Sequence, residues 1–118
     1  MPRRARVCVP GYPLHITQRG HNGNACFLED GGFQLYLEFL DEARTKADCH
    51  VHAFVLMSNH VHLIAVPRTP EALPLTLKQT HGRYAAYFNT RRASNGHVWQ
   101  GRYYSCALDE GHLWTAQE

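Results

Sequence analysis

The sequence has no cysteine pair at C-x-x-C spacing, no repeat, no low-complexity stretch and no long apolar run. The four cysteines (Cys8, Cys26, Cys49 and Cys106) are scattered, so they indicate neither a zinc knuckle nor a disulfide framework, and we expect reduced thiols. The basic start, MPRRARVCVPGYPLHI, lacks the apolar stretch of a signal peptide or a membrane span. We therefore expect a cytoplasmic protein with no membrane partner.

Neither sign of charge dominates, because the formal net charge of the 118 residues is only +2. This weakly basic balance permits a nucleic-acid partner without requiring one. The length predicts a single domain over 1–118, in which 1–13 form an extended basic arm broken by three prolines. Histidine, in contrast, is abundant, with nine residues.

The hydrophobic pattern predicts six regular elements. Alternation of apolar and polar residues indicates strands, and apolar residues at helical spacing indicate helices. In chain order we predict strand 14–19, helix 33–47, strands 51–57 and 61–66, helix 71–89 and strand 101–108, with 109–118 opening a further helix. The order β-α-β-β-α-β predicts an α+β fold of the ferredoxin-like type, with an antiparallel sheet and its helices on one face.

The tripeptide His-Val-His occurs twice, at His50–His52 and at His60–His62. Histidines at i and i+2 of a strand point the same way, so both imidazoles can reach one ion at about 2.1 Å. The first copy stands where a helix leads into a strand and can simply be solvated. The second lies inside the predicted sheet, where spacing alone leaves open both a hydrogen-bonded pair and two of the ligands of a metal site.

The stretch LMSNHVHLI, from Leu56 to Ile64, resembles the HUH motif (U is a bulky apolar residue) of single-tyrosine transposases that act on single-stranded DNA. It is most similar to that of the REP-associated tyrosine transposases, which are insertion-sequence-200-like. Flanking matches occur in the family's order and cover almost the whole chain: PGYP with HITQRG at 10–20, HVWQGRY at 97–103, and DE with HL at 109–113.

The resemblance implies that His60 and His62 hold a divalent metal, Mg²⁺ or Mn²⁺, against a scissile phosphate. It also implies single-stranded or hairpin DNA as the partner, with a homodimer as an option. In the family, a tyrosine on the last helix attacks the phosphorus and forms a 5′-phosphotyrosine, which allows rejoining without ATP. That tyrosine lies a few residues beyond the position of Leu113, and the 118 residues contain no counterpart, so no catalytic residue is assigned.

We therefore expect a transposase-like chain truncated before its catalytic tyrosine, which binds DNA and metal but does not cleave. A frame cut short by mutation, a fragment, and substitution by another residue such as Tyr103 or Tyr104 remain open. The alternative function is a non-catalytic nucleic-acid-binding module on a ferredoxin-like sheet, and a third is a metal-binding or structural protein with no DNA role.

Five residues are candidate DNA contacts. Guanidinium groups pair with phosphates or with guanine edges, and an aromatic residue beside a glycine and an arginine suits an unstacked base. The arginines fit solvated surface charges equally well, and Trp99 fits a core position equally well. The candidates are Arg19, Arg83, Trp99, Gln100 and Arg102, whereas Lys78 and His81 are expected on the helix surface.

Overall fold

The structure is a computed structural model that describes residues 10–108. Its elements are β1 (Leu14–Arg19), a short 3-10 turn η1 (His21–Gly23), α1 (Asp30–Ala47), β2 (Cys49–Met57), β3 (His60–Pro67), α2 (Ala72–Arg91) and β4 (Tyr104–Ala107). Each predicted strand and helix up to residue 108 is present. The predicted helix opening over 109–118 and most of the basic arm lie outside the described residues.

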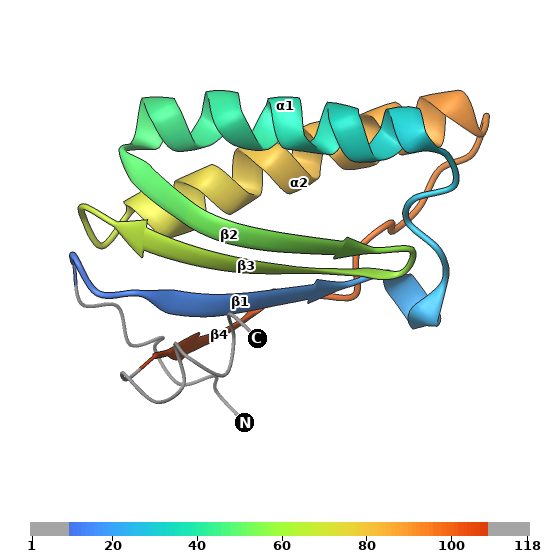
Figure 1. The fold of residues 1–118 in the computed structure, drawn as a ribbon. Helices are drawn as coiled ribbons and strands as arrows, with labels where there is room; N and C mark the ends of the chain where they lie inside the picture. The colour runs from blue at the N-terminus through green and yellow to red at the C-terminus, as the bar shows by residue number, and fades with distance from the viewer. Residues whose placement is uncertain (1–9, 109–118) are drawn as a thin grey trace.

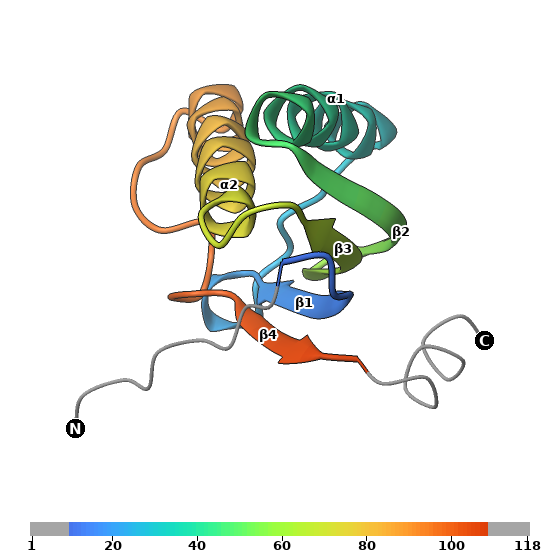
Figure 2. The ribbon, with the colours of Figure 1, turned by 90° about the vertical axis from the view of Figure 1, so that its left-hand side faces the viewer.

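The four strands form one antiparallel sheet in the order β2-β3-β1-β4 (Figure 1). Both helices cover the same face of this sheet, and in the described part of the chain no helix or strand covers the other face (Figure 2). The ferredoxin-like α+β prediction is confirmed. The two-residue connection Ser58-Asn59 predicts a hairpin with Met57 opposite His60 and Val55 opposite His62, and the structure has both pairs.

Glycine accounts for two differences from the predicted boundaries. Helix α1 begins at Asp30, before the apolar pattern does, and Gly32 in its first turn packs so closely that a Cβ there would lie 3.1 Å from the Tyr84 hydroxyl. Strand β4 begins only at Tyr104, because Gly101 has a φ of +54°, a left-handed conformation that ends the extended run.

The core lies between the sheet and the helices, and it contains one polar residue that we expected on the surface. His81 of α2 is buried, with only 7% of its surface exposed. The Tyr36 hydroxyl lies 2.8 Å from its Nε2, and the Trp99 indole N–H donates to its backbone carbonyl at 3.0 Å. The prediction of a surface position was wrong because the buried stripe of α2 includes polar residues, Thr76 and Thr80 among them, whose hydroxyls donate to carbonyls one turn earlier.

Within the described residues, neither helix has the length and apolar character needed to cross a membrane.

The burial of His81 makes the stability of the fold sensitive to acid. It lowers the pKa of His81 from its ordinary value of 6.5 to about 3. Between these values the unfolded chain takes up a proton that the native chain does not, so native stability falls as the pH falls below about 6.5. One such proton contributes about 1.4 kcal/mol per pH unit. The free energy of unfolding, measured in urea from pH 7 to 5, should fall with this slope. We expect a smaller slope in His81→Gln. The control His97→Gln, which changes an exposed histidine, should keep the wild-type slope. Equal slopes in the two variants would contradict the assignment.

Candidate functional site

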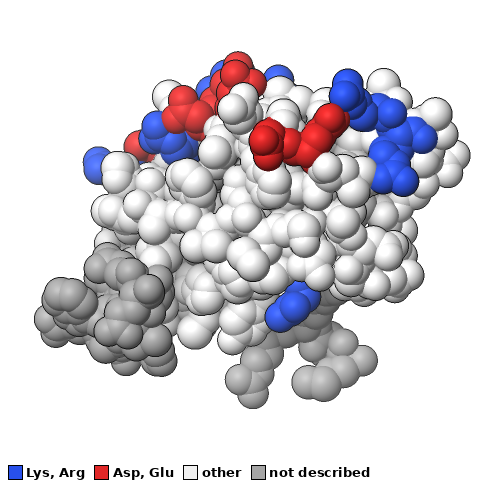
Figure 3. Space-filling view, turned by 45° about the vertical axis from the view of Figure 1, so that its right-hand side comes forward, with Lys and Arg blue, Asp and Glu red and all other residues white. Residues whose placement is uncertain are grey.

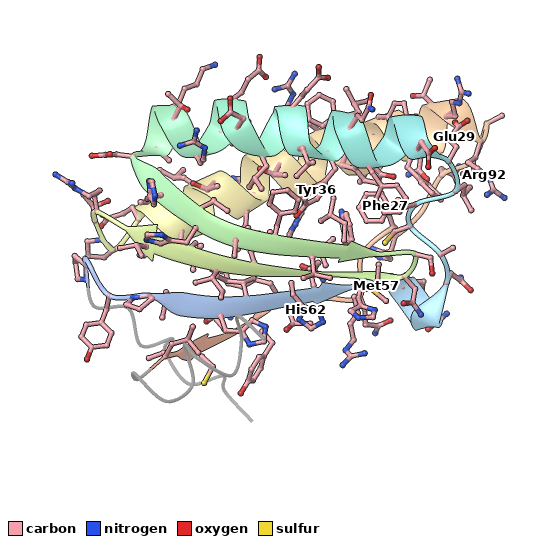
Figure 4. The ribbon with its side chains drawn as sticks, viewed as in Figure 1. Phe27, Glu29, Tyr36, Met57, His62 and Arg92 are labelled. Atoms are coloured by element: carbon pink, nitrogen blue, oxygen red, sulfur yellow. The ribbon has the colours of Figure 1, made fainter. Side chains whose placement is uncertain are left out.

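The helix-free face of the sheet carries a group of polar side chains from its two central strands. Along β3, Val61, Leu63 and Ala65 are buried under the helices, so the alternate residues His60 and His62 point to the other side. On β1, the residue opposite His62 is Thr17, and His15 lies two residues before it on the same face. Figure 4 shows His62 below the sheet, whereas Tyr36 lies between sheet and helices. We call His15, Thr17, His60 and His62 the histidine cluster.

The imidazoles of His60 and His62 lie side by side. Their ring centroids are 4.9 Å apart and their planes are nearly perpendicular, at 89°. The Nδ1 of His60 is 2.7 Å from the side-chain oxygen of Asn59. The Nδ1 of His62 is 3.1 Å from the Nε2 of His15 and 3.3 Å from the hydroxyl of Thr17. Among residues 10–108, the Nε2 of neither His60 nor His62 makes a hydrogen bond.

The turn that carries Asn59 is tied to the end of β1. The Gly20 N–H donates to the Asn59 carbonyl at 2.8 Å. Gly20 is required there because a Cβ would lie 2.2 Å from the Asn24 carbonyl oxygen. The chain after β1 therefore fixes where β3 begins, and with it the position of His60.

The surroundings of His62 favour the neutral imidazole. Partial burial lowers the pKa of His62 below its ordinary value. The neighbouring positive charges that His60, His15 and Arg19 can carry lower it further. A neutral imidazole is the form that binds a metal ion.

The cluster fits part of a metal site. Two adjacent imidazoles with unengaged Nε2 atoms are a suitable donor pair for Mn²⁺, whereas Mg²⁺ prefers oxygen ligands. Across 10–108, no three His, Cys, Asp or Glu side chains are arranged to hold one ion. Further ligands would have to come from other residues, from DNA or from water.

The other His-Val-His copy lacks the hydrogen bonds that hold the rings of His60 and His62 within the described residues. His50 and His52 are both exposed, and their rings lie 4.4 Å apart near the register shift between Val51 and Ala53. In the described part of the chain, no hydrogen bond holds either ring. The two copies therefore share a spacing but not the anchoring that fixes His60 and His62.

Arg19 is the candidate DNA contact that the structure places beside the histidine cluster. It is exposed at the end of β1, directly opposite His60, and its charge acts on His62. Gln100 adjoins Arg19, whose carbonyl accepts the Gln100 backbone N–H at 2.8 Å, and the other candidates lie elsewhere. Trp99 is half-buried and packs against His81 and Phe27, and the Gln100 side-chain oxygen accepts the Asn22 backbone N–H at 2.7 Å.

Arg102 and Arg83 lie away from the cluster. Arg102 is exposed at the rim of a hollow of about 450 Å³ between α2 and the segment before β4. Lys78, also exposed, lines the same hollow, which opens on the helix side of the sheet. Arg83 forms an ion pair with Glu42 and stacks over Phe39. Figure 3 shows that most charged side chains in that view gather over the helix layer, with both signs present, and that a further basic patch lies low on the view, away from the helices.

Tyr103, just before β4, and Tyr104, the first residue of β4, point to opposite sides of the sheet. Tyr103 is half-buried and packs against the core. Tyr104 is 65% exposed and lies opposite Thr17, so it shares the helix-free face with the histidine cluster. The sequence alone showed that the two must diverge but not which one would face the histidines.

Comparison with known proteins gives a family. The sequence model of the family described as "Transposase IS200 like" matches residues 9–118. The chain belongs to this family. None of the curated proteins matches it.

Two solved structures share the fold of this IS200-like transposase. One is a "REP associates tyrosine transposase bound to a REP hairpin", which has 16% identity and a TM-score of 0.69 over 99% of this chain and 68% of the other. The second is a Deinococcus radiodurans R1 protein described as a transposase, with 18% identity and a TM-score of 0.66 over 98% of this chain and 93% of the other.

Three residues of the site had no role predicted from the sequence. His15, Thr17 and Asn59 contact the ring nitrogens of the two histidines. Alternation along 14–19 placed His15 and Thr17 on one strand face, but nothing in the sequence showed which face. Asn59 directly precedes His60, so its position was the available signal.

Proposed function

We propose that this domain binds single-stranded or hairpin DNA across the helix-free face and holds a divalent cation, Mg²⁺ or Mn²⁺, on His60 and His62. The observation that carries the proposal is the pair of adjacent imidazoles with unengaged Nε2 atoms on a face that no described helix covers. When bound, a divalent cation would neutralise charge that develops on the scissile phosphate. The family assignment and the hairpin-bound structural relative support DNA as the partner.

The residues of this domain would bind and orient the DNA strand. Arg19, beside the cluster, would pair with a phosphate oxygen near the cation. The exposed ring of Tyr104 would stack on an unpaired base, an interaction that contributes about 1–3 kcal/mol. In the complete reaction a tyrosine oxygen would attack phosphorus as the bond to the 3′ oxygen breaks, which leaves a phosphotyrosine and a free 3′-hydroxyl.

The other candidate DNA contacts have separate roles in this proposal. Arg102, with Lys78, would bind phosphates at the hollow beside α2. Trp99 and Gln100 would act by holding the segment that carries Arg102, since both side chains already have partners in the fold. A DNA role for Arg83 stays a prediction, and so does a homodimer.

A second function is favoured by Tyr104. An exposed aromatic side chain on an open sheet face is also the feature of a non-catalytic module that stacks single-stranded nucleic acid. In that case DNA binding would not depend on His60 and His62.

The cation assignment can be tested by Mn²⁺ titration, following free Mn²⁺ by electron paramagnetic resonance. We expect His60→Ala and His62→Ala each to weaken Mn²⁺ binding at least about tenfold, because each removes a direct ligand. The matched control is His50→Ala with His52→Ala, which alters the other His-Val-His pair and should leave binding unchanged. Loss of binding in the control, with none in the His60 and His62 variants, would contradict the assignment.

The DNA surface can be tested by the salt dependence of hairpin binding. We expect Arg102→Ala to weaken binding to a single-stranded hairpin and to reduce the slope of log affinity against log salt by about 0.7–0.9, the loss of one phosphate contact. Arg44→Ala is the matched control, because Arg44 pairs with Asp41 on α1 and is not among the candidate DNA contacts. Filter-binding curves for Arg102→Ala that coincide with wild type at every salt concentration would remove Arg102 from the surface.

The chemistry can be tested with the 118-residue chain itself. All six of its tyrosines lie at or before Tyr104, none of them at the family's nucleophile position, so we expect hairpin DNA and Mn²⁺ to give binding without a covalent adduct on a denaturing gel. An adduct would show that another residue attacks. Its loss in Tyr104→Phe, but not in Tyr103→Phe, would then identify the tyrosine on the histidine face.

A further inference from the structure

The two histidines of the proposed cation site are engaged through the same ring atom. Each has a hydrogen-bond partner at Nδ1, and within residues 10–108 neither has one at Nε2. Metal-binding histidines almost always donate the N–H of their other ring nitrogen to a nearby acceptor, which fixes the tautomer and the ring orientation. The repeated pattern on two independent residues therefore points to partners that prepare both rings.

The arrangement at His60 can be assigned from its partner. The Asn59 side-chain nitrogen donates to the Gly23 carbonyl at 3.4 Å, which orients the amide so that its oxygen faces His60. An amide oxygen only accepts, so His60 must carry its proton on Nδ1. Its Nε2 then keeps a free lone pair.

At His62 the partner is another imidazole, and the direction of the hydrogen bond is not fixed by the partner's chemistry alone. We propose that His15 is a positioning residue whose Nε2 accepts the Nδ1–H of His62, so that the Nε2 lone pair of His62 faces outward for the cation. This inference rests on the proposed function, because the cation is the one proposed there. The opposite direction would place a proton on the Nε2 of His62 and block it as a ligand.

Packing holds His15 in this position. The rings of His15 and His62 are stacked, with centroids 5.3 Å apart and planes at 25°. His15 lies opposite Ile64, two residues beyond His62 on β3, so the two imidazoles are diagonal neighbours on one sheet face. Together with Ala53, Val55 and Ile64 they line an apolar hollow of about 260 Å³.

A competing arrangement has His15 as a ligand. Two nitrogens bound at right angles to one ion at about 2.1 Å lie about 3.0 Å apart, close to the 3.1 Å observed between His15 Nε2 and His62 Nδ1. In this case the ion would bind His62 through Nδ1. The two arrangements therefore differ in which nitrogen of His62 binds the metal.

Nitrogen NMR of ¹⁵N-histidine-labelled protein separates these arrangements. Without metal, at mildly alkaline pH, two-bond ¹⁵N–¹H spectra should show His62 protonated on Nδ1, and His15→Ala should shift it toward the Nε2–H tautomer. With Zn²⁺ as a diamagnetic probe, the Nε2 signals of His60 and His62 should shift. Zn²⁺ affinity should fall about 10- to 100-fold in His15→Ala and recover largely in His15→Gln, whose amide oxygen can accept the same hydrogen bond.

Three results would overturn the inference: His62 protonated on Nε2 in the wild type, a Zn²⁺-dependent shift at His62 Nδ1 together with His15 Nε2, or unchanged Zn²⁺ affinity in His15→Ala. Val55→Ala is the control for general disturbance of the cluster and should retain the wild-type tautomer, because Val55 lies opposite His62 and its side chain forms no hydrogen bond. If neither His60 nor His62 responds to Zn²⁺, the cation site of the proposed function fails. The metal-free tautomer still decides the direction of the His15 hydrogen bond in that case.

Discussion

The pleat of strand β3, which places alternate side chains on opposite faces of the sheet, is the constraint on which the rest of the site depends. Three of its apolar residues, Val61, Leu63 and Ala65, are buried against the helices and fix which way the strand faces. A shift of one residue in register would bury both imidazoles and expose the core residues. Hydrophobic burial on one side of the sheet thus holds His60 and His62 together on the other. No further interaction is needed to choose the face on which this histidine pair lies.

The neighbouring strands determine which side chains lie beside the two imidazoles. β1 lies between β3 and β4, so Thr17 has His62 on one side and Tyr104 on the other. The same pairing places Arg19 opposite His60 and His15 diagonal to His62. A row of side chains from three strands therefore spans the face on which we propose that DNA binds. The identical spacing at His50 and His52 lies on the edge strand β2, and within residues 10–108 neither ring has a hydrogen-bond partner.

Much of the fold could be predicted from the sequence because alternation and helical spacing report directly on burial. The hairpin register followed from the two-residue turn, and the i, i+2 spacing placed His60 and His62 on one face of the sheet without showing which face. The contact between His15 and His62 could not be predicted, because it depends on the register of β1 against β3, which brings together two residues 47 positions apart in the chain. The burial of His81 was missed because its partners, Tyr36 and Trp99, come from distant segments.

The central claim is that one cation lies between the Nε2 atoms of His60 and His62, and anomalous diffraction from crystals grown with Mn²⁺ and a single-stranded hairpin tests it most directly. The account predicts an anomalous peak about 2.1 Å from both Nε2 atoms, with a DNA phosphate oxygen among the other ligands. A peak at His50 and His52, or no peak on the helix-free face when DNA is bound there, would contradict it.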